Sequence, residues 1–174
     1  MLTAILIGFM GTGKTTVGNV LAINTQQQQI DLDDEIVSAA GKSIKQVFAE
    51  DGEAAFRQLE TTVLKTAFKR NGILSTGGGV IESETNRAVL EATEIPIIFL
   101  KTLPTVILER LTGEDAAVRP LVGQLGPAGL TRLWKKREPL YESISDLTIL
   151  TDELTPEEVS EKIETFLAQK SAVE

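Results

Sequence analysis

A glycine-rich loop near the start of the chain has the residue types and the spacing that hold phosphate groups. Residues 8–15, called the glycine-rich loop below, read GFMGTGKT and match the pattern G-x-x-x-x-G-K-[ST]. The glycines let successive backbone N–H groups turn toward one anion, and the positive end of a following helix adds to the attraction. Lys14 would reach the terminal phosphates, and the hydroxyl of Thr15 suits Mg²⁺. The pattern therefore predicts a site for a nucleoside triphosphate and its magnesium ion.

A short acidic run offers two carboxylates for a second reactant. Asp31 and Asp33 lie at and after a weak strand predicted at residues 30–32, and alternation along an extended segment would point both to one side. Beside a bound magnesium nucleotide, one carboxylate can hold the metal through water while the other accepts a hydroxyl proton. A structural role fits the spacing equally well, because Asp33 is a good N-cap and acids in a first turn suit the helix dipole.

Three arginines are candidate cations, and each also has an ordinary structural explanation. Arg57 lies between two glutamates at helical spacing, which by itself favours a surface ion pair. Arg119 lies in the weakly patterned stretch 112–126, which suits either a mobile flap over the phosphates or an ordinary surface loop. Arg137 ends a basic run that a solvated helix face would explain. Spacing alone therefore assigns none of the three to a site.

Three consecutive glycines, residues 77–79, follow a strand predicted at residues 73–75. At the carboxyl end of a parallel strand, glycines allow a ligand to approach the backbone closely. A plain turn rarely needs three glycines in a row. This run is therefore a second candidate ligand contact.

Alternating strands and helices must position these residues. Apolar runs predict strands at residues 2–8, 30–32, 73–75, 95–100 and 147–150. Helical spacing predicts helices between them, with capping boxes that begin at Ser43 and Thr155. The strand at 30–32 is weak, because the preceding polar run favours a solvated loop or a frayed helix end. The order of the elements predicts an α/β fold with one parallel sheet covered on both faces.

Composition excludes several classes of protein. A chain of 174 residues with 42% apolar and 24% charged residues fits one globular domain. The absence of both Cys and His excludes disulfides, Ser-His-Asp triads and His or Cys zinc sites. The net charge of −8 argues against nucleic acid or an anionic membrane as the main partner. The sequence holds no apolar run of membrane-spanning length, so we expect a cytoplasmic protein, and a monomer.

Taken together, these residues resemble the shikimate kinases, which are P-loop kinases with a nucleoside-monophosphate-kinase-like fold. The resemblance covers nearly the whole chain and is carried, in order, by GFMGTGKTTVG (8–18), DLDDEI (31–36), GKSIKQVFAEDGEAAFRQLE (41–60), STGGGV (75–80), VRPL (118–121) and KREPLYE (136–142). It implies a single domain, 1–174, with three layers and five parallel strands in the order 2-3-1-4-5. It also implies a substrate-binding region at about 31–60 and a lid at about 112–126. The implied reaction transfers the γ-phosphate of ATP to the 3-hydroxyl of shikimate, on the chorismate route to aromatic amino acids.

The resemblance assigns one set of residues to the nucleotide. The phosphates are held by Gly11, Thr12, Gly13, Lys14, Thr15 and Thr16. Thr15 binds Mg²⁺, and Asp31 supports the water shell of the metal. Arg119 matches the lid arginine on the phosphates, and Arg110 matches a position near adenine. Lys14 and Arg119 are thereby predicted to act in catalysis.

The resemblance assigns a second set of residues to shikimate, which is the phosphate acceptor. Arg57 and Arg137 match the pair that holds the shikimate carboxylate, and Gly78 and Gly79 present backbone to the same molecule. Asp33 matches the residue that grips the shikimate hydroxyls and is the candidate base. An acceptor with one carboxylate and several hydroxyls needs cationic forks at one end and an acid at the other, which this set supplies.

Two alternatives stay open on sequence alone. A related P-loop kinase could act on another small hydroxylated acid such as gluconate, although FRQLE, TGGGV and REPLY together argue against it. A protein of the same descent could bind ATP and shikimate without catalysis, although intact Lys14 and Asp33 argue against that role.

The chain departs from the usual pattern at Asn19 and at the polar residues 26–29, which could affect local stability or the placement of the two aspartates.

Overall fold

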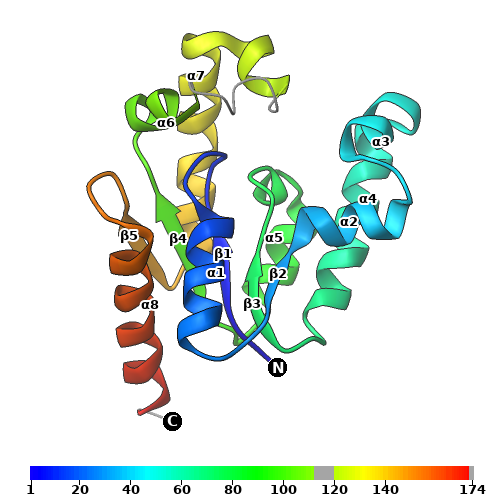
Figure 1. Ribbon diagram of the computed structural model, residues 1–174. Helices are drawn as coiled ribbons and strands as arrows, with labels where there is room; N and C mark the ends of the chain where they lie inside the picture. Colours follow the sequence, from blue (N-terminus) through cyan, green and yellow to red (C-terminus); the bar gives the residue numbers. More distant parts are fainter. Residues whose placement is uncertain (112–119, 173–174) are drawn as a thin grey trace.

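The computed structural model of the protein describes residues 1–111 and 120–172, with residues 120–122 described by their backbone alone. Within these residues, five parallel strands form one sheet in the order β2-β3-β1-β4-β5 (Figure 1). The strands are β1 (Leu2–Ile7), β2 (Gln29–Asp31), β3 (Gly72–Ser75), β4 (Ile97–Lys101) and β5 (Leu147–Leu150). This confirms the strand order and the parallel sheet expected from the sequence.

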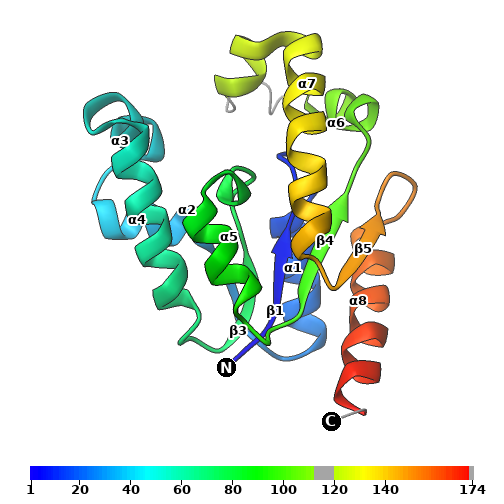
Figure 2. The ribbon, with the colours of Figure 1, turned by 180° about the vertical axis from the view of Figure 1, so that it is seen from behind.

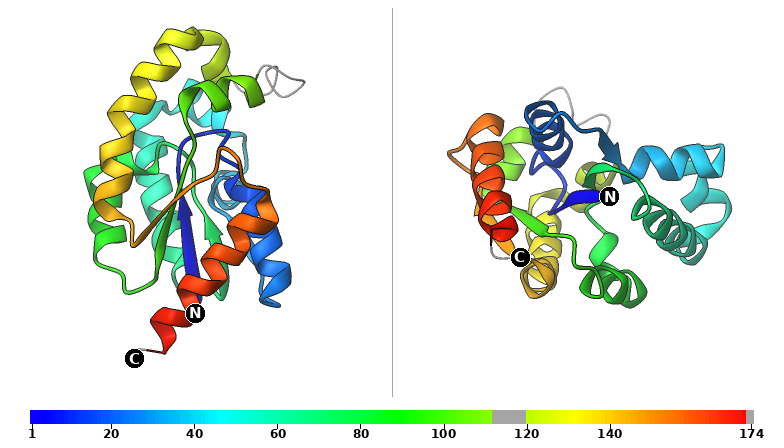
Figure 3. Two further views of the ribbon diagram at one scale, coloured as in Figure 1. Left: turned by 90° about the vertical axis from the view of Figure 1, so that its left-hand side faces the viewer. Right: turned by 90° about the horizontal axis from the view of Figure 1, so that it is seen from below.

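Helices cover both faces of the sheet. The helical elements are α1 (Lys14–Asn24), α2 (Leu32–Ala40), α3 (Ile44–Glu50), α4 (Gly52–Ala67), the short 3-10 turn η1 (Val80–Glu82), α5 (Glu84–Glu91), α6 (Pro104–Leu111), α7 (Pro120–Ile144) and α8 (Pro156–Ser171). Helices α1 and α8 lie on one face, and α5 and α7 lie on the other (Figures 1 and 2). Figure 3 shows the sheet between these two helical layers, which is the three-layer arrangement predicted.

The alternation of side chains along β1 fills a core on each face of the sheet. Ala4 and Leu6 belong to the cluster formed with α1 and α8, whereas Ile5 and Ile7 belong to the larger cluster on the opposite face. All four side chains are fully buried. Burial on both faces explains why this strand reads as a continuous apolar run.

Helices α2, α3 and α4 form a separate group beside the β2 edge of the sheet (Figure 1). The half-exposed ring of Phe48 in α3 packs against the buried ring of Phe56 in α4, with centroids 4.5 Å apart. The capping box predicted at Ser43 is present, and so is the one at Thr155 that begins α8. The predicted substrate-binding region, about 31–60, falls on this helical group.

The polar run before β2 forms a short connection rather than a longer frayed helix. Helix α1 ends at Asn24, Gln26 takes a positive φ of 55°, and Gln29 already belongs to β2. The side chain of Gln29 donates a hydrogen bond of 3.2 Å to Ser75 Oγ in the neighbouring strand. The departure at residues 26–29 is therefore compatible with strand pairing, because Gln29 bonds its neighbour.

Helix α7 contains a break and is anchored beyond it. Gly126 has φ 63° and ψ 177°, and Pro127 begins a new helical stretch. Farther along, the indole Nε1–H of Trp134 donates a hydrogen bond of 2.8 Å to the carbonyl of Thr102, and the ammonium of Lys101 lies 6.0 Å from the ring centroid. The later part of α7 is thereby fixed to the end of β4.

No helix within the described residues has the length and apolar character that crossing a membrane requires.

Candidate active site

The glycine-rich loop joins β1 to α1, and its glycines are required for two different reasons. At Gly8, φ is 152°, and a Cβ would lie 2.5 Å from the carbonyl oxygen of Leu100, so a larger residue does not fit. Gly13 is the N-cap of α1 with a left-handed φ of 86°, and a Cβ there would meet nothing within 4 Å. The loop therefore presents its backbone to open space at a helix N-terminus, which is the geometry of an anion site.

Lys14 lies inside this loop. Its ammonium donates hydrogen bonds to the carbonyl oxygens of Gly8 and Phe9, at 2.8 and 2.9 Å. Only 9% of the residue is exposed, so the positive charge is concentrated in the space that the loop encloses. The hydroxyl of Thr12 also donates to Phe9 O, at 2.9 Å, which turns this side chain into the loop, whereas Thr16 is exposed on α1.

Arg110 of α6 lies beside the same loop. Its guanidinium donates to the carbonyl of Gly11 at 3.3 Å and to the carbonyl of Thr151, just after β5, at 3.4 Å. This contact places a cation between the glycine-rich loop and the end of the sheet. Arg119 lies outside the described residues, as does most of the predicted lid at about 112–126.

Thr15 and Asp31 form an oxygen pair at the carboxyl edge of the sheet. The Thr15 hydroxyl donates to Oδ2 of Asp31 at 2.8 Å. Hydroxyl and carboxylate oxygens are ligands that Mg²⁺ accepts, and it usually completes its shell with water and nucleotide phosphates. In residues 1–111 and 120–172, no group of three or more acidic, His or Cys side chains could hold a metal alone. This donor set fits a magnesium ion that arrives with a nucleotide.

Asp33 reaches the site by a different route from the one predicted. Helix α2 begins at Leu32, so residues 31–33 do not alternate along an extended strand. The N-cap is Asp31, which accepts the backbone N–H of Asp33 at 2.9 Å, so the N-cap role suggested for Asp33 is wrong. From the first turn of α2, Oδ1 of Asp33 lies 2.8 Å from the position that a Cβ on Gly77 would take.

The environment of Asp33 raises the pKa of its carboxyl toward neutral pH. The pKa of Asp33 is raised to about 6, and burial is the largest cause. The neighbouring charge of Asp31 contributes to this rise, whereas the ammonium of Lys14 opposes it. Such a carboxyl can accept a proton from a hydroxyl group near pH 7.

Arg57 and Arg137, called the arginine pair below, converge on Gly79. A Cβ on this glycine would lie 2.7 Å from one terminal nitrogen of Arg57 and 3.2 Å from one of Arg137. Arg137 comes from α7 and is only 5% exposed, so it does not belong to a solvated helix face. Arg57 comes from α4 and stands over the ring of Phe56, 5.1 Å from its centroid. Two residues remote in sequence thus place two cations at the third glycine of 77–79.

Comparisons with known proteins agree with this geometry. The family model described as shikimate kinase matches residues 10–168. The chain belongs to the shikimate kinase family. A shikimate kinase of Limosilactobacillus fermentum is 48% identical over 94% of both chains, and one of Enterococcus faecalis is 37% identical over 94% of this chain and 96% of its own.

Solved structures of shikimate kinases share the same architecture. The one from Acinetobacter baumannii, in complex with shikimate, has a TM-score of 0.87 and 34% identity, covering 98% of this chain and 95% of its own. A gluconokinase from Sinorhizobium meliloti has a TM-score of 0.64 at 15% identity over 96% and 91% of the two chains. The second likeness shows a shared fold and nothing about the substrate.

In this member of the shikimate kinase family, three buried polar residues around the arginine pair were missed by the sequence analysis. Glu60 is 1% exposed and accepts hydrogen bonds from Arg57 at 2.9 Å and from Asn86 at 2.8 Å. Burial raises the pKa of Glu60, and Arg57 opposes that effect. The hydroxyl of Tyr141 donates to the carbonyl of Gly78. Their helical spacing gave no sign of burial, so tertiary packing alone reveals these contacts.

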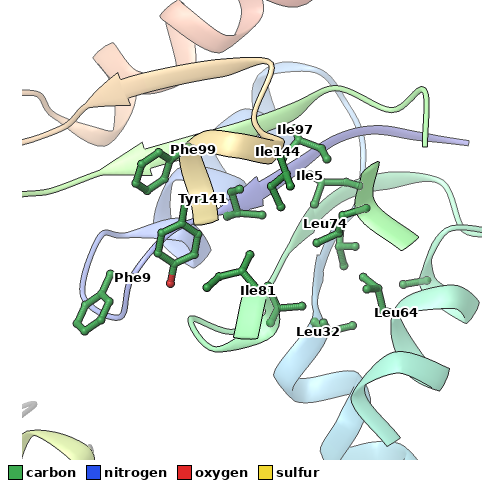
Figure 4. Packing of buried hydrophobic residues seen from close by; sticks show 14 of the residues in the cluster. Ile5, Phe9, Leu32, Leu64, Leu74, Ile81, Ile97, Phe99, Tyr141 and Ile144 are labelled. Carbon is green, nitrogen blue, oxygen red and sulfur yellow. The ribbon is translucent and has the colours of Figure 1, made fainter. Parts of the chain in front are cut away.

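The ring of Tyr141 lies among buried hydrophobic residues that include Phe9 and Phe99 (Figure 4). The ring of Tyr141 stacks on Phe99 of β4 with centroids 4.9 Å apart. Phe9 of the glycine-rich loop belongs to the same cluster, and the guanidinium of Arg137 lies 5.5 Å from its ring centroid. These contacts connect α7 to both the glycine-rich loop and residues 77–79.

Proposed function

We propose that this chain transfers the γ-phosphate of ATP to the 3-hydroxyl of shikimate, producing 3-phosphoshikimate and ADP. The observation that carries the proposal is the meeting of Arg57 and Arg137 at Gly79, two residues from the glycine that Asp33 contacts. Paired guanidinium groups suit one carboxylate, and a nearby acid suits a hydroxyl group. Shikimate carries both functions, and a shikimate complex is known for the relative from Acinetobacter baumannii.

On the nucleotide side, we propose that residues 11–16 hold the phosphates of ATP. The backbone of the glycine-rich loop faces open space, and the Lys14 ammonium lies within it. Thr15 and Asp31 would hold Mg²⁺, which neutralises phosphate charge when bound. Arg110 would border the adenine side, and Arg119 would reach the phosphates from the lid.

The chemistry relies on positioning and electrostatics. The shikimate hydroxyl oxygen attacks the γ-phosphorus, a new O–P bond forms, and the bond to the β-phosphate oxygen breaks as ADP leaves. Asp33 orients the hydroxyl and accepts its proton, a role supported by its raised pKa of about 6. Lys14 and Arg119 balance the charge that builds on the transferred phosphoryl group.

We further propose that the chain works as a single-domain monomer in the cytoplasm, without nucleic acid or membrane. The net charge of −8 supports the last part of this proposal, because it disfavours nucleic acid and anionic membranes as partners. Light scattering of the protein as it elutes from a size-exclusion column, with and without ATP and shikimate, tests the oligomeric state. A mass of one chain, 18.8 kDa, is expected.

The activity is tested by ADP release from MgATP with shikimate, gluconate or a nucleoside monophosphate as acceptor. ADP release that depends on shikimate alone is expected, and mass spectrometry should find one phosphate added to shikimate. Lys14→Met serves as the inactive reference, because it removes the ammonium inside the loop. Release with gluconate but not shikimate would overturn the assignment. Binding of both ATP and shikimate without ADP release would instead support a protein that has lost catalysis.

A further inference from the structure

Glu82 contacts both members of the arginine pair, and the proposed function gives it no role. Its Oε1 accepts a hydrogen bond of 3.3 Å from Nε of Arg137, and its Oε2 lies 3.9 Å from a terminal nitrogen of Arg57. We propose that Glu82 is a positioning residue that holds Arg137, and with it the arginine pair, in the geometry that receives the shikimate carboxylate. This inference rests on the proposed function and adds a residue to the acceptor side of the site.

Glu82 binds one edge of the Arg137 guanidinium and leaves the terminal nitrogens available for the substrate. Glu82 binds the Nε edge of Arg137, whereas the two terminal nitrogens lie against Gly78 and Gly79, 3.5 and 3.2 Å from the Cβ positions of those glycines. A guanidinium is planar, so fixing one edge also fixes the direction of the others. Glu82 therefore sets where the terminal N–H groups of Arg137 point.

Glu60 holds the other arginine in the same manner. It binds one terminal nitrogen of Arg57 at 2.9 Å, while the second terminal nitrogen faces Gly79. Each arginine thus donates a hydrogen bond to a carboxylate and turns a terminal nitrogen to the same glycine. This shared arrangement is why we assign Glu82 to positioning rather than to an ordinary surface ion pair.

The backbone of Glu82 is firmly placed. Its N–H donates to the carbonyl of Gly79 at 3.0 Å, and its own carbonyl accepts from Arg87 at 3.2 Å. The next residue, Ser83, caps α5 by accepting the backbone N–H of Asn86. The carboxylate therefore extends from a short, doubly anchored turn, and its position follows residues 77–79 directly.

The charge of Glu82 suits this role. Burial acts to raise its pKa, but the nearby cations Arg137 and Lys136 outweigh it, and the net effect lowers the pKa of Glu82. The carboxylate is therefore ionised at neutral pH and makes a charge-assisted hydrogen bond to Arg137. Its side chain is 20% exposed, against 67% for Glu53, the other acid close to Arg57.

A carboxylate beside the arginine pair has two opposing effects on an anionic substrate. Its charge repels the shikimate carboxylate, whereas its hydrogen bond orients the guanidinium that binds it. Because Glu82 contacts Arg137 through Nε, we expect its orienting effect on the guanidinium to outweigh its repulsion of the substrate carboxylate. Removing Glu82 should therefore raise the KM for shikimate, and removing a merely repulsive charge would lower it.

The experiment compares steady-state kinetics and calorimetric shikimate binding for the wild type, Glu82→Ala, Glu82→Gln and the matched control Glu53→Ala. Glu53 also lies 3.8 Å from Arg57, so its removal takes away one negative charge without touching Arg137. We expect Glu82→Ala to raise the KM and Kd for shikimate about 10-fold, the magnitude of one charge-assisted hydrogen bond. The turnover number and the KM for ATP should stay within twofold. Glu82→Gln, which keeps an acceptor, should recover part of the loss, and Glu53→Ala should not raise the KM.

A double-variant cycle with Arg137→Lys separates positioning from general loss of structure. Lysine keeps the charge but has no Nε–H for Glu82 to bind. In that background, Glu82→Ala should change the shikimate KM by less than about twofold, whereas two independent sites would give the same rise in both backgrounds. An unchanged or lower KM in Glu82→Ala alone would overturn the inference while leaving the proposed function intact. A wild type that neither binds nor phosphorylates shikimate would overturn both.

Discussion

The hydroxyl of Thr15 donates a hydrogen bond of 2.8 Å to Oδ2 of Asp31, which joins the start of α1 to the start of α2. The other carboxylate oxygen of Asp31 accepts the backbone N–H of Asp33 and so caps α2. One carboxylate therefore connects the proposed metal site to the helix that carries the candidate base. A change at the metal site can be transmitted to the acceptor side through this single residue.

Asp31→Asn should raise the Mg²⁺ concentration needed for half-maximal activity about 10-fold, because the variant removes the charge that supports the metal and its waters. Asparagine is as good an N-cap as aspartate, so α2 should keep its cap and the Tm should change little. ADP release measured across a magnesium titration checks this expectation, and EDTA should abolish activity in both proteins. An unchanged magnesium requirement would remove Asp31 from the metal site.

Asp33→Asn should lower turnover about 10²- to 10⁴-fold, the range that general bases contribute. The KM for ATP should not change, since Asp33 contacts Gly77 on the acceptor side of the site. Steady-state kinetics with saturating shikimate check the size of the loss. A loss of only a few-fold would leave Asp33 with a positioning role and no role as a base.

Asp33→Asn should also stabilise the metal-free protein at alkaline pH. The pKa of Asp33 in the folded protein, about 6, is above its ordinary value of 3.8, so the folded state binds the proton more tightly. The stability gained from that proton is present below pH 3.8 and lost as the pH rises through about 6. At pH 8 the ionised carboxylate then costs about 3 kcal/mol. Thermal unfolding in EDTA should show a higher Tm for the variant at pH 8 and nearly equal values at pH 4, whereas Asp34→Asn, on the exposed side of the same turn, should show no such difference.

Arg57→Ala should raise the KM for shikimate about 10- to 100-fold, because charge-assisted hydrogen bonds to a carboxylate are lost. The KM for ATP should be unaffected, since this arginine contacts residues of the acceptor side. Kinetics with each substrate varied in turn make the comparison. A rise in the KM for ATP of the same size would place Arg57 on the nucleotide side.

Gly79→Ala should raise the KM for shikimate by a similar factor while leaving the fold stable. The backbone of Gly79 has φ −88° and ψ 3°, which alanine tolerates. Its Cβ would meet the terminal nitrogens of both arginines at 2.7 and 3.2 Å, and these flexible ends would have to move. Displacement of about 1 Å at a substrate contact is enough to cost up to 100-fold. Equal Tm values with an unchanged KM would show that the arginine pair does not bind the acceptor at Gly79.

The glycine-rich loop could be predicted from the sequence because its chemistry is local. The pattern in residues 8–15 requires a preceding strand and a following helix, and both are present. The strand β2 was harder, because a polar side chain at Gln29 is satisfied by Ser75, which lies in a strand far along the chain. The polar residues before β2 therefore made the strand look weak, although a hydrogen bond to the neighbouring strand supports it.

The acceptor side could not be predicted from spacing alone. Arg57 at helical distance from two glutamates favoured a surface ion pair, yet one of those acids, Glu60, is 1% exposed. Glu82 gave no signal because its partners lie on α4 and α7 and meet it only in the folded chain. The resemblance to a known family supplied the arginine pair, and the three-dimensional packing supplied the residues that hold it.

Trp134 is the sole tryptophan of the chain, and only 8% of it is exposed. Its indole bonds the carbonyl of Thr102, so the ring reports on the junction between β4 and the later part of α7. The tryptophan emission of the whole protein therefore comes from one buried fluorophore whose indole N–H bonds the carbonyl of Thr102. A shift in that emission during a titration with ATP or shikimate reads the state of a single junction, without any attached label.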